Sequence, residues 1–143
     1  MIEYIVIHCS DSPNGLDDRR FDGPGAVNLW HKQKGFDGIG YHFLIDESGE
    51  SYHGRPIFPD TGEIWNGAHV RGYNTRSIGI CLMGSRNFHE SQLITLRKEI
   101  DFIKSIPQWS KAQLVGHYQL DDKKTCPNFN VKYWYSTGKL KPQ

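Results

Sequence analysis

The sequence predicts a single α/β domain over residues 1–143, with a central mixed β-sheet flanked by helices. Residues 2–9, 39–46 and 77–83 are apolar, rich in β-branched side chains and too short for typical helices, which favours buried strands. Leucine and isoleucine recur at helical spacing within residues 89–106. Strands separated by helices in this order are typical of an α/β fold, and no internal repeat or linker divides the chain.

The segments between these elements carry loop and turn signals. Residues 10–25 are dense in glycine, proline, aspartate and asparagine and predict a loop, whereas residues 26–34 predict a helix that ends at Gly35. Ser48-Gly49 predicts a turn into a short strand at residues 51–55. The other expected elements are a long ordered loop at 56–74, a strand at 113–117, a loop at 121–130 and a short helix at 131–135.

Charge and composition exclude several classes of function. The chain carries 17 Lys and Arg against 16 Asp and Glu, a net charge of +1, so we expect no nucleic-acid binding by bulk electrostatics. The first ten residues lack the cationic leader and cleavage site of a signal peptide, and no apolar stretch is long enough to span a membrane. We therefore expect a protein made in the cytoplasm without a signal peptide.

The first predicted strand ends in a histidine. Strand alternation places Ile5, Ile7 and Cys9 on one face of the sheet and Val6 and His8 on the other. A histidine at a strand end, directly before a polar loop, is either a metal ligand or a locally hydrogen-bonded side chain. Cys9 points the opposite way, and we interpret it as a small core residue.

A second strand-end histidine and a cysteine complete a candidate metal site. His117 ends the last predicted strand, and Cys126 follows nine residues later. Together with His8 they would fill three tetrahedral positions of zinc and leave the fourth for water, as in catalytic sites. Two alternatives stay open: a buried free thiol beside a satisfied histidine, and a nucleophilic Cys126 activated by His117. Three cysteines in the chain are too few, and odd in number, for a disulfide framework.

Two further residues would make such a metal useful in catalysis. Lys124 lies two positions before Cys126, so its ammonium group could sit near a developing oxyanion. Tyr41 could present its hydroxyl as a donor or proton shuttle. The alternatives are a solvated loop lysine and an ordinary core aromatic. The sequence has no Walker loop, GxGxxG, HExxH or nucleophile-elbow motif, which excludes the chemistry of those sites.

Four segments carry a resemblance to a known family. They are IVIHCSDSP, LWHKQKGFDGIGYHFLID, GAHVRGYNTRSIGICLMG and GHYQLDDKKTCPNFNVKYW. In this order they closely resemble the phage-lysozyme branch of the N-acetylmuramoyl-L-alanine amidases, which share the peptidoglycan-recognition-protein fold. The resemblance runs from about residue 4 to about residue 134, nearly the whole chain.

The resemblance implies a role for each candidate residue. Position by position, it implies one Zn²⁺ ion held by His8, His117 and Cys126, and roles in amide cleavage for Tyr41 and Lys124. Cys126 bears on the activity because recognition-only relatives of this fold typically lack that ligand. The resemblance therefore implies hydrolysis rather than binding alone.

The same resemblance extends to the substrate groove, with two departures from the pattern. His69 and Asn74 match a segment that lines the groove, and we expect both to contact the substrate. The loop between His117 and Cys126 is about a residue longer than the pattern, and Phe36 stands where a tryptophan is commoner. Neither departure touches the expected metal ligands.

The expected activity is hydrolysis of the amide between N-acetylmuramic acid and L-alanine in peptidoglycan, as in endolysins. Zinc would activate the water, and Lys124 and Tyr41 would stabilise the oxyanion; no carboxylate stands out as the general base. One alternative is a module that binds peptidoglycan without cutting it. Another, implied by some phage relatives, is inhibition of a phage RNA polymerase. We expect a monomer that acts on the cell wall after its release from the cytoplasm.

Overall fold

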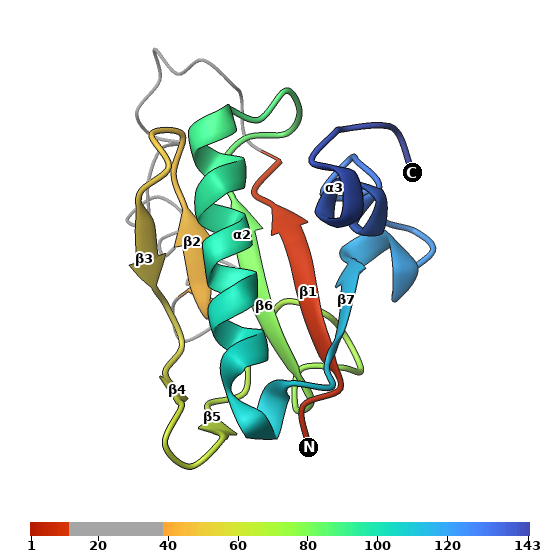
Figure 1. The fold of residues 1–143 in the computed structure, drawn as a ribbon. Coiled ribbons are helices and arrows are strands. Elements are labelled where there is room, and N and C mark those ends of the chain that lie inside the picture. Colours follow the sequence, from red (N-terminus) through yellow and green to blue (C-terminus); the bar gives the residue numbers. More distant parts are fainter. Residues whose placement is uncertain (12–38) are drawn as a thin grey trace.

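The main sheet is mixed, as the sequence predicts. The structure, a computed structural model, describes residues 1–11 and 39–143 (Figure 1). Its five-stranded sheet has the order β3-β2-β6-β1-β7, and β3 is the antiparallel strand, paired with β2. The strands are β1 (Tyr4–Cys9), β2 (Phe43–Ile45), β3 (Ser51–His53), β6 (Ser77–Leu82) and β7 (Gln113–Gly116).

Strand β1 lies between β6 and β7 and is parallel to both. Its side chains alternate as expected: Ile5, Ile7 and Cys9 belong to the main core, whereas Val6 packs on the other face with Val70. A strand paired on both edges and covered on both faces is buried along its whole length, which explains its run of apolar residues. His8 shares the face of Val6 and is 1% exposed.

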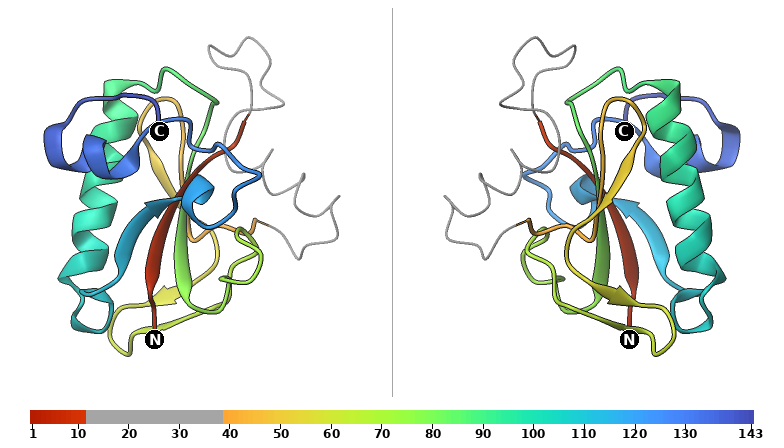
Figure 2. Two further views of the ribbon diagram at one scale, coloured as in Figure 1. Left: turned by 90° about the vertical axis from the view of Figure 1, so that its right-hand side faces the viewer. Right: turned by 90° about the vertical axis from the view of Figure 1, so that its left-hand side faces the viewer.

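Two helices cover one face of this sheet. Helix α2 (Glu90–Ser105) packs Leu96, Ile100 and Ile103 into the main core, and α3 (Val131–Thr137) adds Trp134. Figure 2 shows both helices on one side of the sheet and the segment between β5 and β6 on the other. His8 is therefore on the side of the sheet opposite α2 and α3.

The predicted boundaries of the long helix are accurate to one residue. The helix begins after His89, whose backbone N–H donates to the Gln92 side-chain oxygen at 2.9 Å. The Gln92 amide group in turn donates to the Met83 carbonyl at 2.9 Å, which ties the first turn to the end of β6. Pro107 begins a 3-10 helix at Pro107–Trp109, so proline ends the α-helix as expected.

Several predicted elements differ from the structure in type or in bounds. The strand predicted at 51–55 ends two residues earlier, at His53. The predicted loop at 56–74 contains a small antiparallel hairpin, β4 (Ile57–Phe58) and β5 (Glu63–Ile64), because strands of two residues show no periodicity. The strand predicted at 113–117 ends one residue earlier, at Gly116, and His117 begins a 3-10 helix. The strand predicted at 39–46 is paired only over Phe43–Ile45.

Two predicted elements fall on residues that the structure does not describe. The helix predicted at 26–34 lies outside the described residues, as does nearly all of the loop predicted at 10–25. Within the described ranges, 1–11 and 39–143, no helix is long and apolar enough to cross a membrane.

A buried histidine joins the sheet to the segment before β6. The Gly79 N–H donates to His42 Nδ1 at 3.0 Å, so the ring proton sits on Nε2, which donates to the Trp65 carbonyl at 2.7 Å. Both bonds need the neutral imidazole, because a proton on Nδ1 would face the Gly79 N–H. Burial is the main cause that lowers the pKa of His42 to about 4.

This histidine should make the fold sensitive to acid. Between pH 6.5 and 4 the unfolded chain binds a proton at His42 that the folded chain does not, so the free energy of unfolding falls as pH falls through this window. The loss is roughly 3 kcal/mol. Urea unfolding at pH 7 and pH 4 should show a smaller acid loss in His42→Gln than in the wild type. His53→Gln, at an exposed histidine, should keep the wild-type difference; equal acid losses in all three proteins would contradict this role of His42.

Candidate metal centre

Neighbouring parallel strands bring the two strand-end histidines together. Ile7 of β1 pairs with Gly116 of β7, and the residue that follows each of them is a histidine: His8 within β1 and His117 directly after β7. Their ring centroids are 4.6 Å apart. Because parallel strands end at the same edge of a sheet, both side chains are delivered to one place.

Cys126 reaches the same place from the loop after β7. Its Sγ lies 3.8 Å from His8 Nδ1 and 3.8 Å from His117 Nδ1. Tetrahedral zinc with ordinary bond lengths would separate its sulfur and nitrogen ligands by about 3.6 Å. Among the residues that the structure describes, these three form the group able to hold a metal ion, with their ligand atoms within 4.8 Å of one another. The donor set and its spacing fit zinc.

Backbone hydrogen bonds hold the Cys126 loop in position. The Tyr118 N–H donates to the Cys126 carbonyl at 3.2 Å, and the Asn128 N–H donates to the Thr125 carbonyl at 2.9 Å. The Cys9 N–H donates to Cys126 Sγ at 3.2 Å, a contact that also stabilises a thiolate. Cys9 itself is buried in the main core, as expected, but its backbone forms part of the site.

The surroundings of Cys126 decide whether its thiol is protonated. A side-chain hydrogen bond with Cys9, and then burial, raise the pKa of the Cys126 thiol above its ordinary value. Without a metal the thiol therefore keeps its proton, and a cation that binds here must displace it. The nearness of Cys126 Sγ to His8 as well as His117 favours a metal ligand over the nucleophilic thiolate that was the alternative, because a nucleophile activated by His117 leaves His8 without a role.

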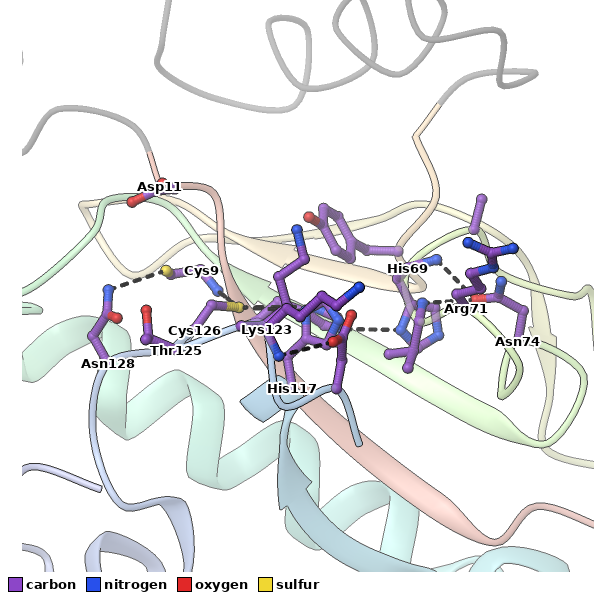
Figure 3. Close-up of a pocket in the computed structure, with 16 residues that line it drawn as sticks. Cys9, Asp11, His69, Arg71, Asn74, His117, Lys123, Thr125, Cys126 and Asn128 are labelled. Atoms are coloured by element: carbon purple, nitrogen blue, oxygen red, sulfur yellow. Dashed lines mark hydrogen bonds between the residues drawn. The ribbon is translucent and has the colours of Figure 1, made fainter. Parts of the chain in front are cut away.

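His117 and Cys126 lie in the middle of a pocket of about 850 Å³ (Figure 3), and His8 also lines this pocket. Asp11 and Asn128 lie toward one end of it, and Arg71 and Asn74 toward the other. The two ends thus differ in charge, with a carboxylate at one and a guanidinium at the other. A pocket of this size is in the range of ligand-binding clefts.

Both predicted catalytic residues line the pocket. The Tyr41 ring centroid is 5.1 Å from that of His8. Burial, and then the nearby thiols of Cys81 and Cys126, raise the pKa of Tyr41 well above its ordinary value. Tyr41 therefore keeps its proton at neutral pH and can donate it. Lys124 is exposed, and its positive charge adds to the effect of burial in lowering the pKa of His117.

The structure gives both groove residues contacts within the protein. His69 Nδ1 lies 2.8 Å from His8 Nε2, so its ring touches a candidate ligand directly. The Asn74 side-chain oxygen accepts the backbone N–H groups of His69 (2.8 Å) and Val70 (2.9 Å). Both residues also line the pocket, so a substrate contact stays a prediction for each. The pattern GAHVRGYN predicts that this segment lines the groove. It does not predict these contacts, because a side-chain hydrogen bond leaves no repeating pattern in the sequence.

Comparison with known proteins identifies the family. The model of a family described as N-acetylmuramoyl-L-alanine amidase matches residues 1–129. The chain belongs to this family. The sequence resemblance is thereby confirmed, and so is the class of enzyme, an amide hydrolase.

Relatives of this amidase occur among phage lysis enzymes and recognition proteins. The endolysin of Klebsiella phage KP32 is 33% identical over 95% of this chain and 87% of its own length. The solved structure of the endolysin amidase LysCS from Clostridium intestinale URNW matches with a TM-score of 0.74 at 27% identity, over 92% of this chain and 78% of that one. Apis mellifera PGRP-SA matches with a TM-score of 0.75 at 25% identity, over 95% of this chain and 82% of its own. The amidase therefore has the predicted peptidoglycan-recognition-protein fold.

A pair of substitutions should show how much the hydrogen bonds accepted by Asn74 contribute to stability. Asn74→Ala leaves two backbone donors without their acceptor and should lower the free energy of unfolding by about 1–3 kcal/mol. Asn74→Asp retains a side-chain oxygen at the same place and should keep most of the stability. Urea unfolding measures both; equal stability of wild type and Asn74→Ala would mean that the contact with His69 and Val70 contributes nothing.

Proposed function

We propose that this amidase is a zinc-dependent endolysin that hydrolyses the amide between N-acetylmuramic acid and L-alanine in peptidoglycan. The observation that carries the proposal is the meeting of His8, His117 and Cys126, with ligand atoms within 4.8 Å of one another, inside the pocket. Membership of the amidase family supports the choice of the amide bond as the one that is hydrolysed. The relatives named endolysins support the cell wall as the place of the reaction.

The pocket residues divide the chemistry between them. Zinc held by His8, His117 and Cys126 would supply Lewis acidity, which polarises a carbonyl group and makes water nucleophilic at neutral pH. The exposed Lys124 ammonium places positive charge where the carbonyl oxygen becomes an anion. Tyr41 keeps its proton because of burial, so we assign it the role of hydrogen-bond donor to the same oxygen or to the departing amine.

Peptidoglycan binding without hydrolysis is the rival function. Peptidoglycan-recognition proteins share the fold, so the fold does not decide between the two. The ligand set favours the enzyme, because a binding module needs neither a thiolate on a metal nor a protonated tyrosine and a lysine beside it. Cys126, placed 3.8 Å from both histidine nitrogens, is the residue on which this choice depends.

The relatives named endolysins also support a setting for the reaction. We propose that residues 1–143 act as a single amidase domain, as a monomer, on the cell wall after release from the cytoplasm of the producing cell. His69 and Asn74 would contact the substrate from the wall of the pocket. An interaction with a phage RNA polymerase stays a prediction from the resemblance, and a pull-down with the purified polymerase tests it.

Loss of the thiolate should remove the metal. Cys126→Ser leaves two nitrogen ligands and should take the zinc content from one ion per chain to none after gel filtration, with hydrolysis abolished. Circular dichroism should show the fold retained. Cys81→Ala, which removes a buried thiol outside the ligand group, should keep zinc. A Cys126→Ser variant that keeps both metal and activity would refute the ligand assignment.

The two proposed catalytic residues should behave differently from the ligands. Tyr41→Phe and Lys124→Ala each remove one group that stabilises the transition state, so each should lower kcat by roughly 10²–10³-fold. Both variants should keep one zinc ion per chain by elemental analysis. Loss of zinc in either variant would move that residue from catalysis to metal binding.

Mass spectrometry of digested peptidoglycan tests the bond itself. Purified sacculi treated with the protein should release stem peptides that begin with a free L-alanine amine, and a zinc chelator should stop the release. Sacculi that sediment with the protein but yield no product would support the binding module instead. Sugar–sugar cleavage with the amide intact would overturn the proposed function.

A further inference from the structure

We propose that His69 is a positioning residue, which fixes the tautomer and the ring orientation of His8 through a hydrogen-bonded chain that runs from His8 through His69 to Ser77. This inference rests on the proposed metal site and gives His69 a role toward His8 in addition to its proposed contact with the substrate. His69 lies on the segment between β5 and β6, on the side of the sheet opposite α2 and α3.

The direction of the chain can be deduced from its far end. The Ser77 hydroxyl lies 2.8 Å from the Tyr73 carbonyl oxygen, which can only accept, so the hydroxyl donates its proton there. The Ser77 oxygen lies 3.3 Å from His69 Nε2 and is left to accept from it. His69 therefore carries its proton on Nε2, and its Nδ1 is an acceptor.

The chain then fixes the state of His8. Because His69 Nδ1 accepts, His8 Nε2 must donate to it across 2.8 Å. The His8 proton is thus on Nε2, and the lone pair is on Nδ1, the atom that lies 3.8 Å from Cys126 Sγ. A metal-ligating histidine needs this arrangement, in which one nitrogen binds the ion while the other donates to a fixed partner.

The His69 ring is fixed in position by a close-fitting cradle. A Cβ atom on Gly67 would lie 2.4 Å from His69 Cδ2, and one on Gly79 would lie 2.7 Å from His69 Nδ1. Real side chains do not approach so closely, so both positions require glycine beside this ring. Asn74 holds the backbone of His69 at the same time. A ring seated in this way adapts little, which suits a positioning role.

The charge of the group that accepts the His8 hydrogen bond also affects a metal ion bound to His8. Second-shell partners of metal-bound histidines are commonly carboxylates, which add negative charge. His69 is an imidazole, so it orients His8 through one acceptor nitrogen and adds no negative charge. With Cys126 as its one anionic ligand, a zinc ion held here would keep a net positive charge, which favours Lewis acidity.

Zinc affinity and tautomer together test this inference. His69→Leu removes the acceptor and should weaken zinc binding by about 10–100-fold in a competition titration with a chromophoric chelator. His69→Asn, whose side-chain oxygen can stand in for Nδ1, should recover most of the affinity. In metal-free protein with ¹⁵N-labelled histidine, NMR should show His8 as the Nε2–H tautomer in the wild type and in His69→Asn, but not in His69→Leu.

A control separates this role from a general loss of structure. Val70→Ala removes buried packing at the next residue, which faces the cluster of Val6 and Val115, and should keep wild-type zinc affinity. If His69→Leu fails to fold, Ser77→Ala tests the same chain from its far end and should weaken zinc binding to a smaller degree. Unchanged affinity and an unchanged His8 tautomer in the folded variants would overturn the inference. A wild type that binds no zinc would instead refute the proposed function.

Discussion

Parallel pairing of β1 with β7 is the constraint on which the candidate site depends. The register that places Ile7 opposite Gly116 also places His8 next to His117, although 108 positions separate them along the chain. Cys126 joins them through a loop tied back to Tyr118. A shift of this register by one residue would turn one histidine toward the helix-covered face, because side chains alternate between the faces of a strand. The ligand set and the sheet are therefore specified together.

Hydrogen bonds of His42 and His69 tie together the face of the sheet opposite α2 and α3. His42 joins Gly79 to Trp65, and His69 joins His8 to Ser77. In each case the hydrogen-bond partners allow one tautomer, and burial keeps the ring uncharged. Satisfied polar networks of this kind restrict a buried region to one arrangement. This side of the sheet thus relies on directional bonds where the other side relies on apolar packing against α2.

Periodicity explains what could be predicted about the fold. Alternation along β1 correctly separated His8 from Cys9, and helical spacing located α2 to within one residue. The β4–β5 hairpin was missed because two residues per strand cannot show alternation. The 3-10 helix that begins at His117 was also missed, since its three residues look like the end of a strand. Long elements repeat a pattern often enough to be recognised, and short ones do not.

The sequence by itself determined the α/β class, the family, and the residue types able to bind zinc and to support amide cleavage. The tertiary structure decided that His8, His117 and Cys126 present Nδ1, Nδ1 and Sγ to one point, and that His69 faces His8 rather than solvent alone. The reason is that buried positions in strands and helices recur at regular spacing, so the sequence shows them as a repeating pattern of apolar residues. The partner of a side-chain hydrogen bond is set by proximity in space, and His8 and His69 meet only once β1 and β6 have paired.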